Sequence, residues 1–321
     1  MADYSIKSIR QDFKNKGIFY TPEKLSKFMR NLLPAEVDEI YDPTCGAGNL
    51  LSVFDDEVKK YGQDINSEQV EFAKTRLKNF EGVAGDTLKL PAFKGKKFNY
   101  IIANYPFSIK WEPFADERFE KCPVLPPPSK ADYAFILHII HYLSDSGKAA
   151  VMGFPGILYR GGREQKIRKW IVDQNYIEKI IHIPGNKFTD TAISTIVIVF
   201  NKNKTNSDIV FVDDENGLER TVKITEIQEN NYCLSVQNYV QKEEIKEKIN
   251  PLELMKETRN IFYNHLKKEL EFEKAVCLLN NWNFYEFVDE LQIILNQYKQ
   301  GKEVNKNDKE TNGRRKDKKD S

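Results

Sequence analysis

The sequence predicts an α/β domain with a largely parallel sheet, and two observations lead to this class. Helical and β-rich patterns alternate from about residue 18 to residue 200, an order that places helices against a parallel sheet. Polar residues end four successive predicted strands: Asp42, Asp64, Asp86 and Asn104. Because ligands bind at the carboxyl ends of the strands in such sheets, we expect a binding edge at these four positions.

Helices are predicted where apolar residues recur every three or four positions. Thr21 is the expected N-cap of the first helix, with Pro22 at its first position. Ser67 is the expected cap of a later helix, and Gly147 is expected to end another. The predicted helices cover residues 21–33, 49–60, 67–80, 131–145 and 162–174.

Short runs rich in β-branched and aromatic residues predict the strands between these helices. The predicted strands cover residues 38–42, 60–64, 82–86, 98–104, 148–154, 177–183 and 192–200. After residue 205 the pattern changes, and we expect a small β-containing extension over 205–240 and a helical region over 241–300. Residues 301–321 contain one aliphatic residue, Val304, and are expected to form a disordered polar tail.

Composition limits the classes of function. The chain has 321 residues, 40% of them apolar, and no run near the ~18 apolar residues of a membrane span. The first 17 residues lack the apolar stretch of a secretion signal, so we expect a cytoplasmic protein. With 49 basic and 48 acidic side chains, the net charge of +1 weakens a nucleic-acid hypothesis without removing it.

A metal site is not expected. His138 and His141 lie three residues apart on a predicted helix, a spacing that fits packing better than zinc binding without nearby cysteines. The four cysteines are scattered, which argues against a zinc cluster or a disulfide framework and fits reduced thiols: Cys45, Cys122, Cys233 and Cys277.

The first predicted strand leads into "DPTCGAGNL", a turn that allows close approach of a ligand to the backbone. Gly46 and Gly48 supply the flexibility, and a helix is expected to follow. Leu51 stands where a dinucleotide fingerprint has its third glycine, so the full fingerprint is absent. Asp64 follows Asp42 by 22 positions, where a ribose-binding carboxylate is expected. The pattern therefore predicts a nucleoside-binding edge.

Five motifs in order, "GIFYTP", "DPTCGAGNLL", "GQDIN", "GDTL" and "ANYPF", resemble those of S-adenosylmethionine-dependent DNA adenine-N6 methyltransferases. The sequence is most similar to the modification subunits of type I restriction–modification systems, over roughly residues 13–202 and more weakly to 240. The resemblance implies a Rossmann-like class I methyltransferase fold, with a mostly parallel seven-stranded sheet and helices on both faces. The methyltransferase domain is then residues 18–204, after a lead-in of residues 1–17.

The resemblance also implies the cofactor S-adenosylmethionine and its contacts. Tyr20 and its two successors match the motif that holds the methionine part, Asp64 matches the ribose ligand, and Asp86 matches the contact to the adenine. The full set of cofactor-binding positions is Tyr20, Thr21, Pro22, Asp42, Thr44, Gly46, Gly48, Asn49, Asp64, Ile65, Asp86, Thr87, Leu88 and Asn104.

The catalytic motif matches Asn104, Tyr105, Pro106 and Phe107, where the family usually has Asn-Pro-Pro-Phe or Asn-Pro-Pro-Tyr. An amide oxygen and a main-chain carbonyl can accept the two N–H bonds of the adenine amino group and aim its lone pair at the methyl. Phe107 is expected to stack on the flipped base. Tyr105 departs from the family pattern. Pro106 keeps residue 105 extended, but the tyrosine ring could crowd the pocket.

Two alternatives to DNA methylation stay open, and one expectation concerns partners. The acceptor could be another planar amide, such as protein glutamine, or Tyr105 could close the pocket and leave a cofactor-binding interaction protein without activity. Type I modification subunits usually carry a helical domain before the "GIFYTP" motif, whereas about 17 residues precede residue 18 here. We therefore expect DNA engagement to need a specificity subunit, docked on helices of residues 241–300, with a restriction subunit as a further partner.

Some neighbours of the motifs permit two interpretations. Arg160, Arg163 and Arg168 fit DNA phosphate contacts, and a solvated helix face explains Arg168 equally well. Trp111 and Phe114 fit either the target-base pocket or the packing of their own loop.

Overall fold

The computed structural model describes residues 21–185, 187, 193–241 and 250–313. The chain divides into two units, residues 1–243 and residues 244–321. The first contains a sheet with its helices and the second contains two long helices, and each is described by itself. Tyr20 lies outside the described residues. Within the described part, no helix is long and apolar enough to cross a membrane.

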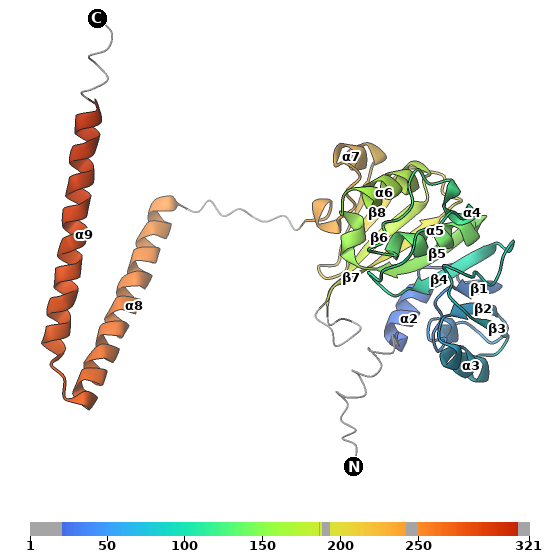
Figure 1. The fold of residues 1–321 in the computed structure, drawn as a ribbon, viewed down its shortest axis with the longest axis horizontal. Coiled ribbons are helices and arrows are strands. Elements are labelled where there is room, and N and C mark those ends of the chain that lie inside the picture. Colours follow the sequence, from blue (N-terminus) through green and yellow to red (C-terminus); the bar gives the residue numbers. More distant parts are fainter. Residues whose placement is uncertain (1–20, 186, 188–192, 242–249, 314–321) are drawn as a thin grey trace, which may run out of the picture. The chain divides into compact units, whose positions relative to one another are not determined.

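The described residues of the first unit form one nine-stranded sheet in the order β3-β2-β1-β4-β5-β7-β6-β8-β9 (Figure 1). Its strands are β1 (Glu39–Asp42), β2 (Lys59–Asp64), β3 (Phe80–Ala84), β4 (Phe98–Asn104), β5 (Leu143–Gly153), β6 (Ile177–Ile183), β7 (Thr195–Asn201), β8 (Ile209–Asp213) and β9 (Leu218–Val222).

The pairing of the strands is mostly parallel. Strands β3, β2, β1, β4 and β5 are joined in parallel, as are β6 and β8, whereas β7 pairs antiparallel with both β5 and β6 and β9 pairs antiparallel with β8. The seven expected strands are present. The described sheet has nine strands where the resemblance implies seven, because residues 205–240 contain β8 and β9 and the buried Ile209 and Phe211 place β8 beside β6.

Helices cover both faces of the sheet, as predicted (Figure 1). Ile101 and Ala103 pack in a core that contains residues of α5 and α6, whereas Ile102 between them packs in a second core with residues of α2 and α3. The helices are α2 (Glu23–Arg30), α3 (Ser67–Arg76), α4 (Glu117–Glu120), α5 (Asp132–Tyr142), α6 (Arg163–Asp173) and α7 (Ile224–Glu229), with 3₁₀ turns η1 (Leu51–Val53), η2 (Pro155–Leu158) and η3 (Val236–Asn238).

The helix predicted over residues 49–60 is wrong. The structure has only the short turn η1 there, and β2 begins at Lys59. The buried ammonium group of Lys60 donates to the main-chain carbonyls of Asp55 and Val58, at 2.6 and 3.0 Å. The carbonyl of Asp55 also accepts from the amide of Val58 at 3.1 Å, so the chain turns at residues 55–58 just before β2.

Three predicted helix ends are also wrong. Pro22, not Thr21, is the N-cap of α2, and Asn66, not Ser67, caps α3 by accepting from two main-chain amides. Helix α5 ends at Tyr142 and β5 follows at once, so Gly147 lies within a strand.

The second unit consists of α8 (Pro251–Asn280) and α9 (Phe284–Gly313), which contact each other. Asn250 caps α8, and Asn281 ends it in the left-handed conformation. Helix α9 continues through residues 301–313, where we expect a disordered tail. This stretch has no proline and is rich in Lys and Glu, which favour helices. Residues 314–321 of the expected tail lie outside the described residues.

Candidate active site

A cavity of about 720 Å³ lies at the carboxyl ends of the first strands. Asp64 and Asn104 end their strands at this edge, and Asp86 follows the end of β3 by two residues. Four loops and two helices, α3 through Gln69 and α5 through Phe135, build the walls. The lining residues are Thr44, Gly46, Asp64, Ile65, Asn66, Gln69, Asp86, Thr87, Leu88, Lys89, Pro106, Ile109, Lys110, Trp111, Glu112 and Phe135.

The turn after β1 lies against the turn after β2 because its glycines allow it. Gly46 has φ +51°, and its amide donates to Asp64 Oδ2 at 2.8 Å. Gly48 has φ +78°, and a Cβ there would lie 2.5 Å from Leu77 Cδ1. Oδ1 of Asp64 accepts from the amide of Asn66 at 2.9 Å. Asp64 therefore fixes both turns while it lines the cavity.

Asp42, at the end of β1, supports the same turn. Its side chain is 1% exposed, and Oδ1 accepts from the amide of Thr44 at 2.9 Å. Burial raises the pKa of Asp42 to about 8, and the nearby charge of Asp64 acts in the same direction. Asp42 does not line the cavity, so its effect on a ligand passes through Thr44.

The loop after β3 carries three of the predicted residues. Oδ1 of Asp86 accepts from the amides of Leu88 and Lys89, at 2.9 and 3.2 Å. The buried hydroxyl of Thr87 donates to the carbonyl of Pro43 at 2.5 Å and so ties this loop to the turn after β1.

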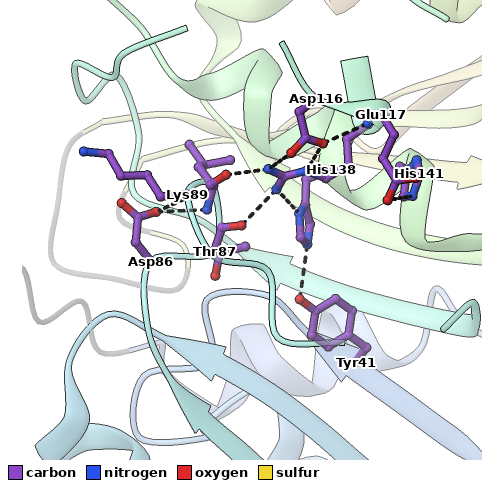
Figure 2. Close-up of polar contacts among 10 residues, drawn as sticks. Tyr41, Asp86, Thr87, Lys89, Asp116, Glu117, His138 and His141 are labelled. Atoms are coloured by element: carbon purple, nitrogen blue, oxygen red, sulfur yellow. Dashed lines mark hydrogen bonds and ion pairs between the residues drawn. The ribbon is translucent and has the colours of Figure 1, made fainter. Parts of the chain in front are cut away.

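Arg118 on α4 also holds this loop, and Figure 2 shows two of its labelled partners, Thr87 and His138. Its guanidinium donates to the main-chain carbonyls of Thr87 and Leu88 and to a ring nitrogen of His138. His138 is fully buried and also contacts the hydroxyl of Tyr41. Nothing in the sequence pattern around Arg118 predicts this role.

The motif at the end of β4 lies beside the cavity. The half-buried Asn104 donates from Nδ2 to the hydroxyl of Thr21 at 3.1 Å. Thr21 is therefore not a helix cap but a partner of the predicted catalytic amide. Pro106 lines the cavity, and Phe107 packs against Phe154 with ring centroids 4.5 Å apart.

Tyr105 does not crowd the cavity. Its ring is 1% exposed and stacks on Phe135, with centroids 5.3 Å apart and an interplanar angle of 12°. The ring of Phe107 meets it edge-on at 5.5 Å. Because Tyr105 points into the core, the departure from the family pattern changes the packing behind the motif and leaves the cavity open.

The structure brings eight predicted residues together as cavity lining. The eight are Thr44, Gly46, Asp64, Ile65, Asp86, Thr87, Leu88 and Pro106. Asn49 does not line the cavity, since its side-chain oxygen accepts from Arg76 at 2.5 Å. Gly48 shapes the turn, and Pro22 precedes α2. The sequence analysis did not predict Gln69, Lys89, Ile109 and Phe135 as lining residues. They lie at the cavity because of the course that their loops and helices take.

The structure decides between the two interpretations for some of the residues near the motifs. Arg168 is 2% exposed and donates to the carbonyls of Ile157, Arg160 and Tyr232, so it is neither a phosphate contact nor part of a solvated face. Arg163 is exposed.

The two aromatic neighbours also differ. Trp111 both lines the cavity and anchors its loop, with its indole N–H donating to Pro127 at 3.0 Å. Phe114 packs against Trp111 and Phe119.

Neither His138 nor His141 belongs to the one cluster of possible metal ligands found in the described part of the chain, His182, Asp213 and Glu215.

Comparisons with known proteins identify the family. A family model described as N-6 DNA Methylase matches residues 3–223. The methylase subunit of the type I restriction enzyme MpnII from Mycoplasma pneumoniae is 32% identical, over 74% of this chain and 55% of that protein. The MjaVII methylase subunit from Methanocaldococcus jannaschii is 28% identical, over 77% and 53%. This chain spans about half the length of the curated relatives it matches.

A solved structure supports the same assignment. The methyltransferase subunit of a type I restriction–modification system from Streptococcus thermophilus has a TM-score of 0.63 and 28% identity, over 70% of this chain and 59% of that one. The predicted fold, a Rossmann-like sheet of class I methyltransferases, is thereby confirmed. Since the family model also covers more than half of the residues, this chain belongs to the N-6 DNA methylase family.

Proposed function

We propose that this chain transfers the methyl group of S-adenosylmethionine to N6 of adenine in DNA, as the methylase component of a type I-like restriction–modification system. The observation that carries the proposal is the position of Asn104, at the end of β4 and beside a cavity that contains Asp64. The family membership and the names of the relatives support it.

The cavity fits the cofactor in size and chemistry. Its volume of about 720 Å³ lies within the usual range for small-molecule sites. Asp64 offers a carboxylate to the ribose hydroxyls, and Ile65 and Leu88 offer apolar surface to a flat base. We name the residues of the three loops that build this part, 42–49, 64–69 and 86–89, the cofactor half.

The catalytic half consists of residues 104–112. The bound cofactor supplies an electrophilic methyl group on a sulfonium. Asn104 then has one task, which is to accept an N–H of the target amino group with its amide oxygen. The hydroxyl of Thr21 supports this task, because it takes up the amide N–H and leaves the oxygen for the base. Positioning of this kind can lower a barrier by several kcal/mol.

The buried position of Tyr105 supports an active enzyme over a cofactor-binding protein with a closed pocket. The main-chain carbonyl at residue 105 is available to the second N–H, whatever the side chain. Phe107 is half-buried next to Phe154 and is the aromatic residue that would stack on a flipped base.

The helices of the second unit supply the surface for a partner, which we propose to be a specificity subunit. Helix α8 contains one buried residue, Cys277, among its described positions, and large apolar side chains stay exposed along it. These exposed residues include Met255, Ile261, Phe262, Leu278 and Leu279. Such a surface favours a helical partner. A restriction subunit is the further partner that this assembly implies.

The test is methyl transfer from labelled S-adenosylmethionine to unmethylated DNA, by the chain alone and with its candidate specificity subunit. We expect label on adenine N6, and a loss of about 10²-fold or more in the Asn104→Ala variant, because the amide acts on the reacting group. A glutamine-containing protein serves as the competing acceptor. Label on that protein and none on DNA under either condition would contradict the proposal.

A further inference from the structure

Arg118 uses all five of its N–H donors in hydrogen bonds, and its partners Asp116, Thr87 and His138 are labelled in Figure 2. It is 5% exposed, and Nε and Nη2 donate to the two carboxylate oxygens of Asp116 at 2.7 and 2.9 Å. Nη1 donates to the carbonyl of Thr87 at 2.9 Å and to Nδ1 of His138 at 3.0 Å, and Nη2 donates to the carbonyl of Leu88. A guanidinium has five N–H donors, and here five acceptors surround it.

This arrangement fixes the state of His138. Because arginine only donates, Nδ1 of His138 must accept, and the ring proton therefore lies on Nε2. Nε2 lies 3.2 Å from the hydroxyl of Tyr41, to which it donates. Burial lowers the pKa of His138 well below 6.5, and the charges of Arg118 and His141 add to the effect against the opposing charge of Asp116. The neutral ring is thus a fixed link between Arg118 and strand β1.

The link acts on the wall of the cavity without entering it. Arg118 and His138 do not line the cavity, whereas Thr87 and Leu88 do. Two neighbouring carbonyls held by one planar group cannot rotate independently, so the peptide planes of this loop are set from behind. The turn of Asp86 fixes the amides of the same loop, and together these bonds leave it one conformation.

We propose that Arg118 and His138 are positioning residues that set the affinity for the adenine end of the cofactor, with little influence on the transfer step. This inference rests on the proposed function, because it takes the cavity as the cofactor site. The residues act on the cofactor half through the main chain of Thr87 and Leu88. Neither residue takes part in the hydrogen bond between Asn104 and Thr21.

The first experiment compares two buried arginines in the full chain. Arg118→Met removes the link, and Arg168→Met is the matched control, since Arg168 also holds three main-chain carbonyls, none of them from cavity residues. Calorimetry gives the Kd for S-adenosylmethionine, and thermal unfolding gives the stability. We expect both variants to lose stability, but only Arg118→Met to bind about tenfold more weakly.

The second experiment keeps the inference testable if Arg118→Met does not fold. His138→Asn retains an acceptor near the position of Nδ1, whereas His138→Leu does not. We expect His138→Asn to bind the cofactor nearly as the wild type does and His138→Leu to bind several-fold more weakly. Methylthioadenosine, which lacks the amino-acid part, should show the same fold loss, because the affected contact lies at the adenine end.

The outcomes separate the two claims. If the wild type binds S-adenosylmethionine and the variants Arg118→Met and His138→Leu bind it with the same Kd, this inference is overturned. The proposed function is not affected by that outcome. An equal loss of affinity in Arg168→Met would also overturn it, because the effect would then be general destabilisation. A wild-type chain without affinity for the cofactor would overturn the proposed function and this inference together.

Discussion

The two halves of the site differ in how their buried polar groups are paired. Behind the cofactor half, all five N–H groups of Arg118 have acceptors. Behind the catalytic half, the hydroxyl of Tyr105 and Oδ1 of Asp132 are buried with no hydrogen-bond partner among the described residues. Directional bonds therefore define the cofactor half, whereas ring packing holds much of the catalytic half.

Hydrogen bonds that involve the main chain do steady the catalytic half, among them those of Trp111 to Pro127 and Pro128 and one at Ser108. Oδ2 of the fully buried Asp132 accepts from the amide of Ser108 at 3.1 Å, and Ser108 has φ +54°, which is uncommon for a residue other than glycine. Arg160 Nη2 lies 3.9 Å from the same oxygen. The carboxylate thus fixes the turn that follows Phe107, and the comparison of the halves can be tested at single residues.

The largest effect is expected at Asp42 in the cofactor half. Burial raises the pKa of its carboxyl group to about 8. Since the folded pKa lies above the unfolded value near 3.8, its contribution to stability is present at low pH and is lost as pH rises from about 4 to about 8. The difference in the free energy of unfolding, Asp42→Asn minus wild type, should therefore increase across this range by at most about 1.4 kcal/mol per pH unit. Urea unfolding of both proteins at several pH values measures the difference.

A difference in unfolding free energy that stays constant between pH 4 and pH 8 would contradict this prediction. Above pH 8 the difference should level off, because the wild-type carboxyl is then ionised in both the folded and the unfolded state.

At Asp132 we expect a smaller effect that separates the halves. Asp132→Ala removes the acceptor for the Ser108 amide, so turnover should fall about tenfold while the Kd for S-adenosylmethionine stays within about twofold. Steady-state kinetics and calorimetry measure the two quantities, with the exposed Asp145→Ala as control. Loss of cofactor affinity equal to the loss of turnover would show that the halves are not independent.

The smallest effect is expected at Tyr105. Tyr105→Phe removes a buried hydroxyl without a partner among the described residues, so the free energy of unfolding should rise by about 1 kcal/mol with turnover unchanged. Tyr133→Phe is the matched control, because its hydroxyl donates to the carbonyl of Ile157 at 2.7 Å and its loss should destabilise by a similar amount. A destabilised Tyr105→Phe would mean that the hydroxyl is paired in solution.

Sequence patterns predict the strands better than the connections. Strands β4 and β6 match the predicted ranges 98–104 and 177–183, because uninterrupted apolar runs between polar residues leave little choice. The helix predicted over 49–60 fails: its apolar residues Leu51, Phe54 and Val58 are buried, but the chain turns at residues 55–58 and begins β2 at Lys59. Periodicity reports which side chains are buried and not where the main-chain carbonyls go.

The same limit applies to the site. Asp64, Asp86 and Gly46 follow predicted strands directly, so their convergence at one edge can be foreseen. Arg118 cannot be foreseen, because its partners Thr87 and Leu88 lie about thirty residues earlier in the chain and contribute only main-chain atoms. No residue type marks such a contact in the sequence.

The most direct test of two separable halves measures cofactor affinity and methyl transfer in one pair of variants, Arg118→Met and Asn104→Ala. We predict that Arg118→Met binds S-adenosylmethionine about tenfold more weakly yet turns over normally at saturating cofactor, and that Asn104→Ala binds nearly as the wild type does but transfers methyl groups about 10²-fold or more slowly. If both variants instead lose affinity and transfer in the same proportion, the division of the site into a cofactor half and a catalytic half is wrong.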